Sequence, residues 1–315
     1  MLLLLHWTNY MKKVCSNCVK FKDTSKLVYN FIKGFTILSS NQTLIKQFQS
    51  FYKEHKPKNF EDAIEKFAIF GGVGWGSVDT SKESYELIEK LILDDYRFIR
   101  NDVTELTSGA PLYHSVLSGI AMGDGRTHSS FKRAKVDKDA GDKAVEELVS
   151  RGIIRVNKAK KLFFTTPFMR FWFAFVSPLF KGVRDGDYKE VQKRWKNRES
   201  EFVQLPFIEL SHELLKQNFQ DDKIIEISTY WDRDVALDIY AKTASGKTVV
   251  GSCKYSNTKV KKSELSKLQE LCKTAKIEAD IFVFVSKKGF SSELKSLKSK
   301  NLKLFTLKNF NSLLK

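Results

Sequence analysis

The side chains best suited to chemistry in this sequence are an aspartate and a lysine on two neighbouring predicted strands. Residues 235–242 alternate apolar and polar side chains and include Asp238; after a break, the strand pattern at 248–255 carries Lys254. Because paired strands lie only about 4.8 Å apart, we expect the two side chains to lie close together at one sheet edge. A carboxylate binds a hard cation through oxygen, and a lysine beside it can orient water or offset charge on a phosphate. The pair therefore indicates metal-dependent hydrolysis of a phosphodiester.

This pair resembles the signature of the PD-(D/E)XK nuclease-like superfamily, in which an aspartate on one strand is followed by an acid-x-lysine on the next. The resemblance implies that Asp238 binds Mg²⁺ and that Lys254 positions the attacking water. It also implies a further carboxylate from the helix before the sheet, where Glu209 and Glu213 lie about one helical turn apart. Either glutamate could supply a second oxygen ligand for Mg²⁺, the cofactor that we expect.

Two acidic positions of the superfamily pattern are neutral in this sequence. Ser252 stands two residues before Lys254, and Ala236 stands two residues before Asp238. A neutral hydroxyl is a poor substitute for a carboxylate beside a divalent cation. Two alternatives follow. One is an active metal-dependent endodeoxyribonuclease, and the other is an inactive nuclease-like domain in which Asp238 and Lys254 form a buried ion pair.

The overall charge points to a polyanionic partner. The net charge is +17, which favours nucleic acid, DNA above all, over an acidic membrane surface, with a generally lysine-rich surface as the alternative explanation. No run of roughly 18 apolar residues occurs, and the leucines at 2–5 are too few for a signal peptide, so we expect no membrane partner. Four cysteines in 315 residues suit a reducing compartment, and we expect a cytoplasmic protein.

Residues 1–110 are predicted to form a helical N-terminal region. Apolar side chains recur at helical spacing in four segments: 26–37, 42–55, 59–70 and 81–93. The glycine-rich segment 70–76 follows a helical pattern, lacks the G-x-G-x-x-G spacing and has no lysine after it. It therefore predicts a tight turn rather than a phosphate-binding loop.

Residues 111–180 are predicted to form a winged helix followed by an aromatic connector. Three helices precede two short strands, at 112–121, 127–135, 140–151, 153–156 and 162–165. In a winged helix the basic hairpin can rest on a phosphate backbone. The third helix is acidic, which leaves a purely architectural winged helix as the alternative. The residues predicted to bind nucleic acid here are Arg151, Arg155, Lys158, Lys160 and Lys161.

Residues 200–315 are predicted to form a nuclease-like α/β domain. Around the two strands that carry Asp238 and Lys254, the patterns predict helices at 207–219, 263–275, 291–300 and 309–314, and strands at 224–231, 281–285 and 302–306. The resulting order, α-β-β-β-α-β-α-β, matches the restriction-endonuclease-like core of the resembled superfamily. Three lysines after the second of the paired strands are predicted to bind nucleic acid: Lys259, Lys261 and Lys262.

One apparent nucleotide-binding motif is misleading. Residues 241–248 fit a relaxed Walker A expression, A-x-x-x-x-G-K-T. A phosphate-binding loop joins a strand to a helix, whose N-terminal amides hold the phosphate, whereas a strand pattern continues here. We therefore expect a hairpin turn at this segment and no nucleotide partner.

The order of the winged helix, the aromatic segment and the last strand motif resembles one family. The aromatic segment reads F-W-F-A-F-V at 171–176, and the strand motif reads G-S-C-K-Y at 251–255. They resemble the C-terminal, uncharacterised region of archaeal and bacterial DEXX-box-type ATPases, from residue 112 onward, and residues 1–110 are too few for the ATPase domain. We therefore expect a DNA-associated protein with a nuclease-like C-terminal domain. The alternative is a non-catalytic protein-interaction or regulatory module that docks a protein partner, such as an ATPase, in trans.

Overall fold

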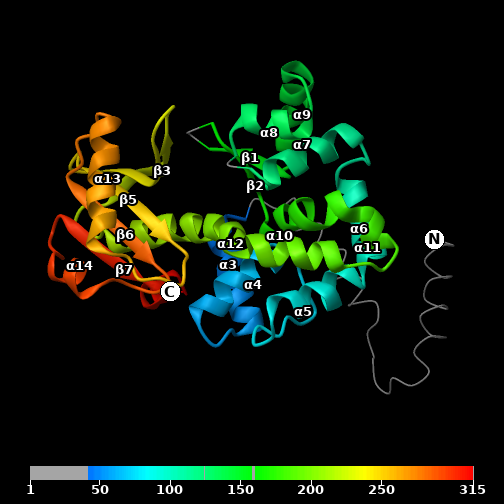
Figure 1. The fold of residues 1–315 in the computed structure, drawn as a ribbon, viewed down its shortest axis with the longest axis horizontal. Coiled ribbons are helices and arrows are strands. Elements are labelled where there is room, and N and C mark those ends of the chain that lie inside the picture. Colours follow the sequence, from blue (N-terminus) through cyan, green and yellow to red (C-terminus); the bar gives the residue numbers. More distant parts are fainter. Residues whose placement is uncertain (1–41, 124, 158–159, 315) are drawn as a thin grey trace.

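The computed structural model describes residues 42–123, 125–157 and 160–314. Within these ranges, a helical N-terminal region is followed by a mixed five-stranded sheet with helices (Figure 1). The predicted class, α+β or α/β, is confirmed at this level. The helix predicted at 26–37 lies outside the described residues.

The first described helices are α3 (Leu44–His55) and α4 (Phe60–Phe70). Asn59 begins α4, because its side chain accepts a hydrogen bond from the backbone N–H of Asp62. The glycine segment after α4 forms turns, as predicted, and Gly72 has a φ of +82°. The region continues with helix α5 (Ser84–Ile88), the π-helical segment η1 (Glu89–Leu93) and helix α6 (Tyr96–Leu106). The helices predicted among the described residues here are confirmed, and α6 is an addition to them.

The three helices and the hairpin predicted after residue 111 are present. Helices α7 and α8 approach each other closely, since a Cβ on Gly119 of α7 would lie only 2.4 Å from the carbonyl oxygen of Ser130. Asp137 caps the next helix, α9, by accepting a hydrogen bond from the N–H of Ala140. The elements are α7 (Pro111–Ala121), α8 (Thr127–Ala134), α9 (Lys138–Ser150), β1 (Ile154–Val156) and β2 (Leu162–Phe164), with β1 and β2 antiparallel.

The aromatic segment is the centre of the larger hydrophobic core. Phe171 and Phe175 are fully buried and pack edge-on against Trp195 and Phe202 of the following helix. The predicted aromatic connector is divided into four short helical parts. Its parts are α10 (Pro167–Phe171), the π-helical η2 (Trp172–Val176), the 3-10 turn η3 (Ser177–Leu179) and α11 (Phe180–Arg184).

The longest helix, α12 (Lys189–Asn218), runs across the whole molecule from the helical region to the sheet (Figure 1). The predicted helix at 207–219 is only its C-terminal part, and the predicted boundary at residue 200 falls inside it. Pro206 lies within α12 and has no N–H for the helical ladder. The carbonyl of Phe202, four residues earlier, instead accepts a hydrogen bond from Arg170 Nη1 at 2.8 Å.

The sheet has the strand order β3-β4-β5-β6-β7. The first three strands pair antiparallel and the last three pair parallel. Apolar side chains of β4 to β6 pack on α12 on one side, and others pack on α13 on the other. The elements are β3 (Ile224–Trp231), β4 (Ala236–Thr243), β5 (Thr248–Lys254), α13 (Lys262–Thr274), β6 (Ile281–Ser286), α14 (Ser292–Ser296), β7 (Leu302–Thr306) and the 3-10 helix η4 (Leu307–Leu314). The predicted order is confirmed, although α14 is shorter than predicted, and residues 244–247 form the expected hairpin turn.

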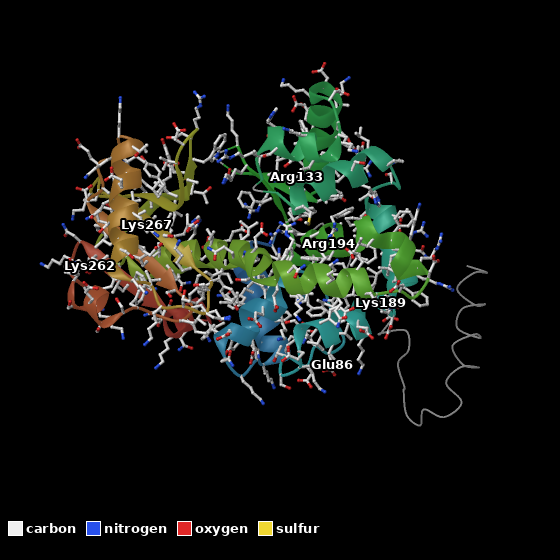
Figure 2. All side chains as sticks on the ribbon, in the orientation of Figure 1. Glu86, Arg133, Lys189, Arg194, Lys262 and Lys267 are labelled. Atoms are coloured by element: carbon white, nitrogen blue, oxygen red, sulfur yellow. The ribbon has the colours of Figure 1, made fainter. Side chains whose placement is uncertain are left out.

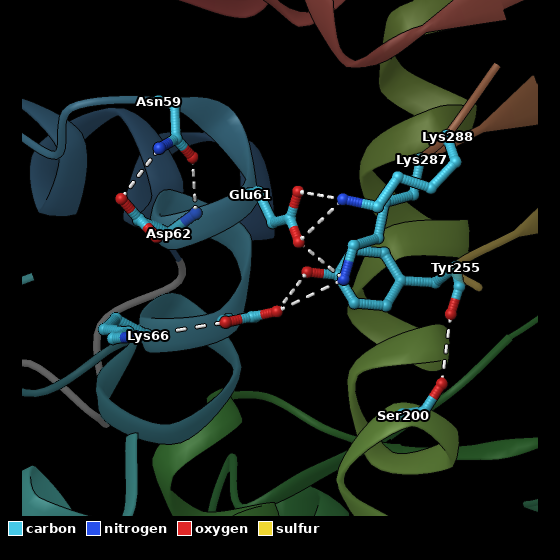
Figure 3. A network of polar contacts seen from close by, with 9 residues as sticks. Asn59, Glu61, Asp62, Lys66, Ser200, Tyr255, Lys287 and Lys288 are labelled. Carbon is cyan, nitrogen blue, oxygen red and sulfur yellow. Dashed lines mark hydrogen bonds and ion pairs between the residues drawn. The ribbon is translucent and has the colours of Figure 1, made fainter. Parts of the chain in front are cut away.

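A buried charge network joins α4 to the sheet (Figure 3). Lys287, at the end of β6, has a side chain only 7 % exposed and lies 2.8 Å from Glu61 and 3.5 Å from Glu65. The Tyr255 hydroxyl donates a hydrogen bond to Glu65, and Lys287 Nζ lies 4.5 Å from the centre of the Tyr255 ring. The N-terminal helices are therefore fixed to the C-terminal sheet. Among the described residues, none of the helices combines the length and apolar composition needed to cross a membrane.

Candidate functional site

Asp238 lies on β4, which pairs with β5 as predicted, and its nearest neighbour on β5 is Ser252 rather than Lys254. One of its carboxylate oxygens accepts hydrogen bonds from Ser252 Oγ at 3.0 Å and from the backbone N–H of Cys253 at 2.8 Å. Burial raises the pKa of Asp238, while the two hydrogen bonds and the charges of Lys254 and Lys161 act to lower it. Ser252 thus serves as a donor to the aspartate.

Lys254 follows on the same edge of the sheet but makes its ion pair elsewhere. Its Nζ lies 3.4 Å from Glu264 of α13, a carboxylate that also pairs with Lys267 at 2.8 Å. The hydrogen bond from Lys267 and the charge of Lys254 lower the pKa of Glu264. Among the described residues, Asp238 and Lys254 do not form the ion pair given as an alternative. Asp238 accepts its hydrogen bonds from β5, and Lys254, which is 40 % exposed, extends to Glu264 of α13.

The two predicted glutamates of α12 are both paired with cations. Glu209 forms an ion pair with Arg155 of β1, and the Arg155 guanidinium also lies 4.9 Å from the centre of the Phe163 ring. Burial raises the pKa of Glu209, and the charge of Arg155 opposes this rise. Glu213 pairs with Lys216 on the same helix at 2.8 Å. Arg155 and Glu209 were predicted for different roles, and the structure brings them together.

His212 fixes β4 to α12. Its Nε2 lies 2.7 Å from the backbone carbonyl oxygen of Asp238. A carbonyl only accepts, so Nε2 carries the proton and donates. Burial lowers the pKa of His212 to about 4, and the ring is therefore neutral at physiological pH. This histidine has the contacts of a core residue.

The β1–β2 hairpin lies over this part of the sheet. Lys161 acts electrostatically on Asp238, and the Arg126 guanidinium lies 4.5 Å from the ring centre of Trp231 on β3. These contacts join segments that are far apart in the sequence, and no spacing pattern indicated them. The hairpin therefore places basic side chains against the acids of the candidate site.

The remaining residues predicted to bind nucleic acid are placed differently. Arg151 is held within the protein, since it pairs with Glu147 at 2.8 Å and donates to Ser108 Oγ. Lys160 is exposed at the hairpin, whereas Lys158 lies outside the described residues. Three lysines around the start of α13 are exposed: Lys259, Lys261 and Lys262. Figure 2 shows Lys262 and Lys267 on this helix.

Each of the predicted Mg²⁺ ligands has a hydrogen-bond or ion-pair partner within the protein. A hard cation of this kind takes several oxygen ligands in near-octahedral geometry. Glu209 is bonded to Arg155, Glu213 is directed to Lys216, and only Asp238 remains beside β5. Within the part of the chain that the structure describes, no three Asp, Glu, His or Cys side chains gather where they could hold a metal ion.

The comparisons with known proteins give one match. Residues 172–267, from η2 through α12 and β3–β5 into α13, match the model of DUF234, described as archaea bacterial proteins of unknown function. The comparison finds no ATPase domain in the chain. No curated protein and no solved structure matches it. The similarity to DUF234 thus covers the strands that carry Asp238 and Lys254, together with the helix that carries Glu209.

Proposed function

We propose that this protein binds nucleic acid, and DNA first, through a nuclease-like α/β domain that does not cleave the bound strand. The proposed relationship to restriction-endonuclease-like domains is supported by the order of elements from α12 to β7 and by the neighbouring positions of Asp238 and Lys254. The proposed winged helix is supported by the three helices α7 to α9 and the β1–β2 hairpin. The net charge of +17 supports a polyanionic partner.

The observation that carries this proposal is a group of lysines around the start of α13, which we call the α13 lysine surface. Its members are Lys254, Lys259, Lys261, Lys262 and Lys267. Lys261 is the N-cap residue of α13, and no side chain caps the helix there. The N–H of Glu264 bonds to the carbonyl oxygen of Lys261, and the positive end of the helix dipole favours an anion at this point. Lysines around such a helix end suit the phosphates of a nucleic-acid backbone.

The absence of cleavage follows from the carboxylates. In phosphodiester hydrolysis of this type, Mg²⁺ is held by one or two carboxylates together with waters and the substrate phosphate. Arg155 neutralises Glu209, and the oxygen of Asp238 that faces β5 already accepts two hydrogen bonds. Ser252 and Ala236 cannot replace a carboxylate. Charge for binding a phosphate backbone thus remains, while the ligands for metal catalysis do not.

The binding part of the proposal is tested by a salt titration. We expect log K for duplex DNA to fall linearly with log of the salt concentration. The triple variant Lys259→Ala, Lys261→Ala, Lys262→Ala is expected to bind more weakly and to reduce this slope by about 2.7, or about 0.9 for each lost phosphate contact. A matched control removes three exposed lysines of α3 and the loop after it, Lys46, Lys53 and Lys58, and is expected to leave the slope unchanged. Equal losses in the two triple variants would show only non-specific attraction.

The cleavage part is tested separately with supercoiled plasmid and Mg²⁺ or Mn²⁺. We expect no nicking above buffer by the wild type, by Asp238→Ala or by Lys254→Ala. Nicking by the wild type that both substitutions abolish would establish an active endonuclease and overturn this part of the proposal. The binding titration would still stand in that case, so the two parts fail independently.

A second candidate function, a protein-interaction module, is favoured by the edge of the sheet. β3 is the first strand of the sheet, and Ile225 on it is 69 % exposed. A strand edge can accept a strand from a partner protein. If DNA binding is absent at low salt, an Ile225→Lys variant that loses a protein partner would support this second function.

A further inference from the structure

An open cavity of about 450 Å³ lies between the α7–α8 pair and the segment from η3 into α12. It is remote in the chain from Asp238 and its neighbours and takes no part in the proposed nucleic-acid surface. Its wall brings together two arginines from different elements, three serines and one exposed aromatic ring. These residues are Arg133 of α8, Arg194 of α12, Ser115, Ser118, Ser177 and Phe180.

The two arginines have no ion-pair partner among the described residues, although Arg133 acts electrostatically on Glu201. Arg194 donates Nη1 to the carbonyl oxygen of Ala174 at 3.2 Å, which holds the guanidinium in place while it keeps its charge. Neither Arg133 nor Arg194 forms an ion pair with an acid among the described residues, and none of the described residues that line the cavity is acidic. Arg198, one turn further along α12, differs, because Glu201 binds it through two nitrogens at 2.9 and 3.0 Å. Two like charges facing one hollow repel each other unless an anion lies between them.

The shape of the cavity depends on glycines beside Arg133. A Cβ on Gly123 would lie 2.2 Å from Arg133 Nη1, so the guanidinium lies directly against that backbone. A side chain at Gly123 would have to displace it. Gly119, whose close contact with Ser130 brings α7 and α8 together, also lines the cavity. The position of Arg133 is thus set by the backbone of the α7–α8 pair.

We propose that this cavity binds a small phosphate-bearing molecule with an apolar ring. Arginine guanidinium groups bind phosphate oxygens through paired N–H donors, and serine hydroxyls add further donors. Phe180, 45 % exposed, and Pro178 provide an apolar wall for the rest of the molecule. The volume lies in the range of small-molecule sites and suits a molecule of mononucleotide size. A neutral ligand would leave both charges unpaired.

The test uses phenyl phosphate and inorganic phosphate as probes, titrated calorimetrically into the full chain at constant ionic strength. We expect saturable binding of one phenyl phosphate per chain, and weaker binding of inorganic phosphate, which cannot contact Phe180. Arg133→Ala is expected to weaken phenyl phosphate at least about tenfold, as for loss of a charge-assisted hydrogen-bonded pair. Lys132→Ala is the matched control, because Lys132 is the exposed neighbour of Arg133, carries the same charge and does not line the cavity.

A second variant keeps Arg133 and moves it. Gly123→Ala is expected to weaken phenyl phosphate binding, because the new Cβ displaces the guanidinium, while far-ultraviolet circular dichroism stays that of the wild type. No saturable binding by the wild type, or equal weakening by Arg133→Ala and Lys132→Ala, would overturn the proposal. Loss of duplex DNA binding in Arg133→Ala would also overturn it, since the cavity would then belong to a nucleic-acid surface.

Discussion

Arg170 and Pro206 are coupled through one carbonyl oxygen, and the coupling can be measured. Pro206 leaves the carbonyl of Phe202 without its helical hydrogen bond, and Arg170 Nη1 supplies the missing donor at 2.8 Å. The Arg170 guanidinium also lies 4.0 Å from the centre of the Phe202 ring. We predict that Arg170→Met destabilises the wild type more than it destabilises a Pro206→Ala variant.

The size of the coupling follows from what differs between the two backgrounds. In the wild type, Arg170→Met leaves the buried Phe202 carbonyl unpaired, which costs about 1–3 kcal/mol. In Pro206→Ala the introduced residue has an N–H and restores the helical hydrogen bond, so that cost disappears. The cation–π contact, worth about 2 kcal/mol when desolvated, is lost in both backgrounds and cancels. Burial lowers the pKa of Arg170 to about 10, which means that burying its charge costs free energy. Arg170→Met removes this cost in both backgrounds, so it also cancels. We expect an interaction energy of about 2 kcal/mol.

Urea unfolding of the wild type, the two single variants and the double variant measures this energy directly. A matched cycle combines Pro206→Ala with Arg198→Met. Arg198 lies on the same helix but pairs with Glu201 rather than with the Phe202 carbonyl, so its effect is expected to be additive. If the Arg170 and Pro206 effects also add to within about 0.5 kcal/mol, the reasoning is refuted.

Two further predictions concern buried charges. Lys287→Met is expected to lower the free energy of unfolding by about 2–3 kcal/mol, because it leaves Glu61 and Glu65 without their buried cation. The control variant Lys288→Met removes an exposed lysine 3.1 Å from Glu61 and is expected to lower it by under about 1 kcal/mol. If urea unfolding gave equal losses of stability for the two variants, burial of Lys287 would not be the cause of the larger effect. Because burial lowers the pKa of His212 to about 4, the unfolded chain binds more protons between pH 6.5 and 4, and the free energy of unfolding falls as the pH falls through this window. His212→Gln keeps a hydrogen-bond donor for the Asp238 carbonyl but cannot titrate. It is expected to remove up to about 3 kcal/mol of the change in unfolding free energy across this window. If the plot of unfolding free energy against pH kept its slope in this variant, His212 would not titrate there.

The order of helices and strands was predictable because apolar periodicity is a local property. The two strand patterns predicted that Asp238 and Lys254 lie on neighbouring strands, and β4 and β5 are paired, but their register brings Ser252 rather than Lys254 against the Asp238 carboxylate. The N-terminal half of α12 was missed, since residues 189–201 are mostly charged and give little apolar stripe, and Pro206 interrupts the pattern. The partners of the candidate residues could not be predicted from spacing. Glu209 meets Arg155 and Lys254 meets Glu264 only because the sheet, α12 and the hairpin fold onto one another.

Those partners change what the predicted residues can do. If the basic hairpin and the acidic side chains lay apart, each could bind a ligand. The hairpin could then bind phosphate, and the acids could bind a cation. Their contact lets Arg155 neutralise Glu209 and brings Lys161 near Asp238, so each set satisfies the other. The α13 lysine surface lies outside this contact, and in it Lys259 and Lys261 are exposed, while Lys254, Lys262 and Lys267 pair with Glu264 or Glu293. For this reason the salt dependence of DNA binding is expected to respond to Lys259, Lys261 and Lys262 and to change little with Arg155.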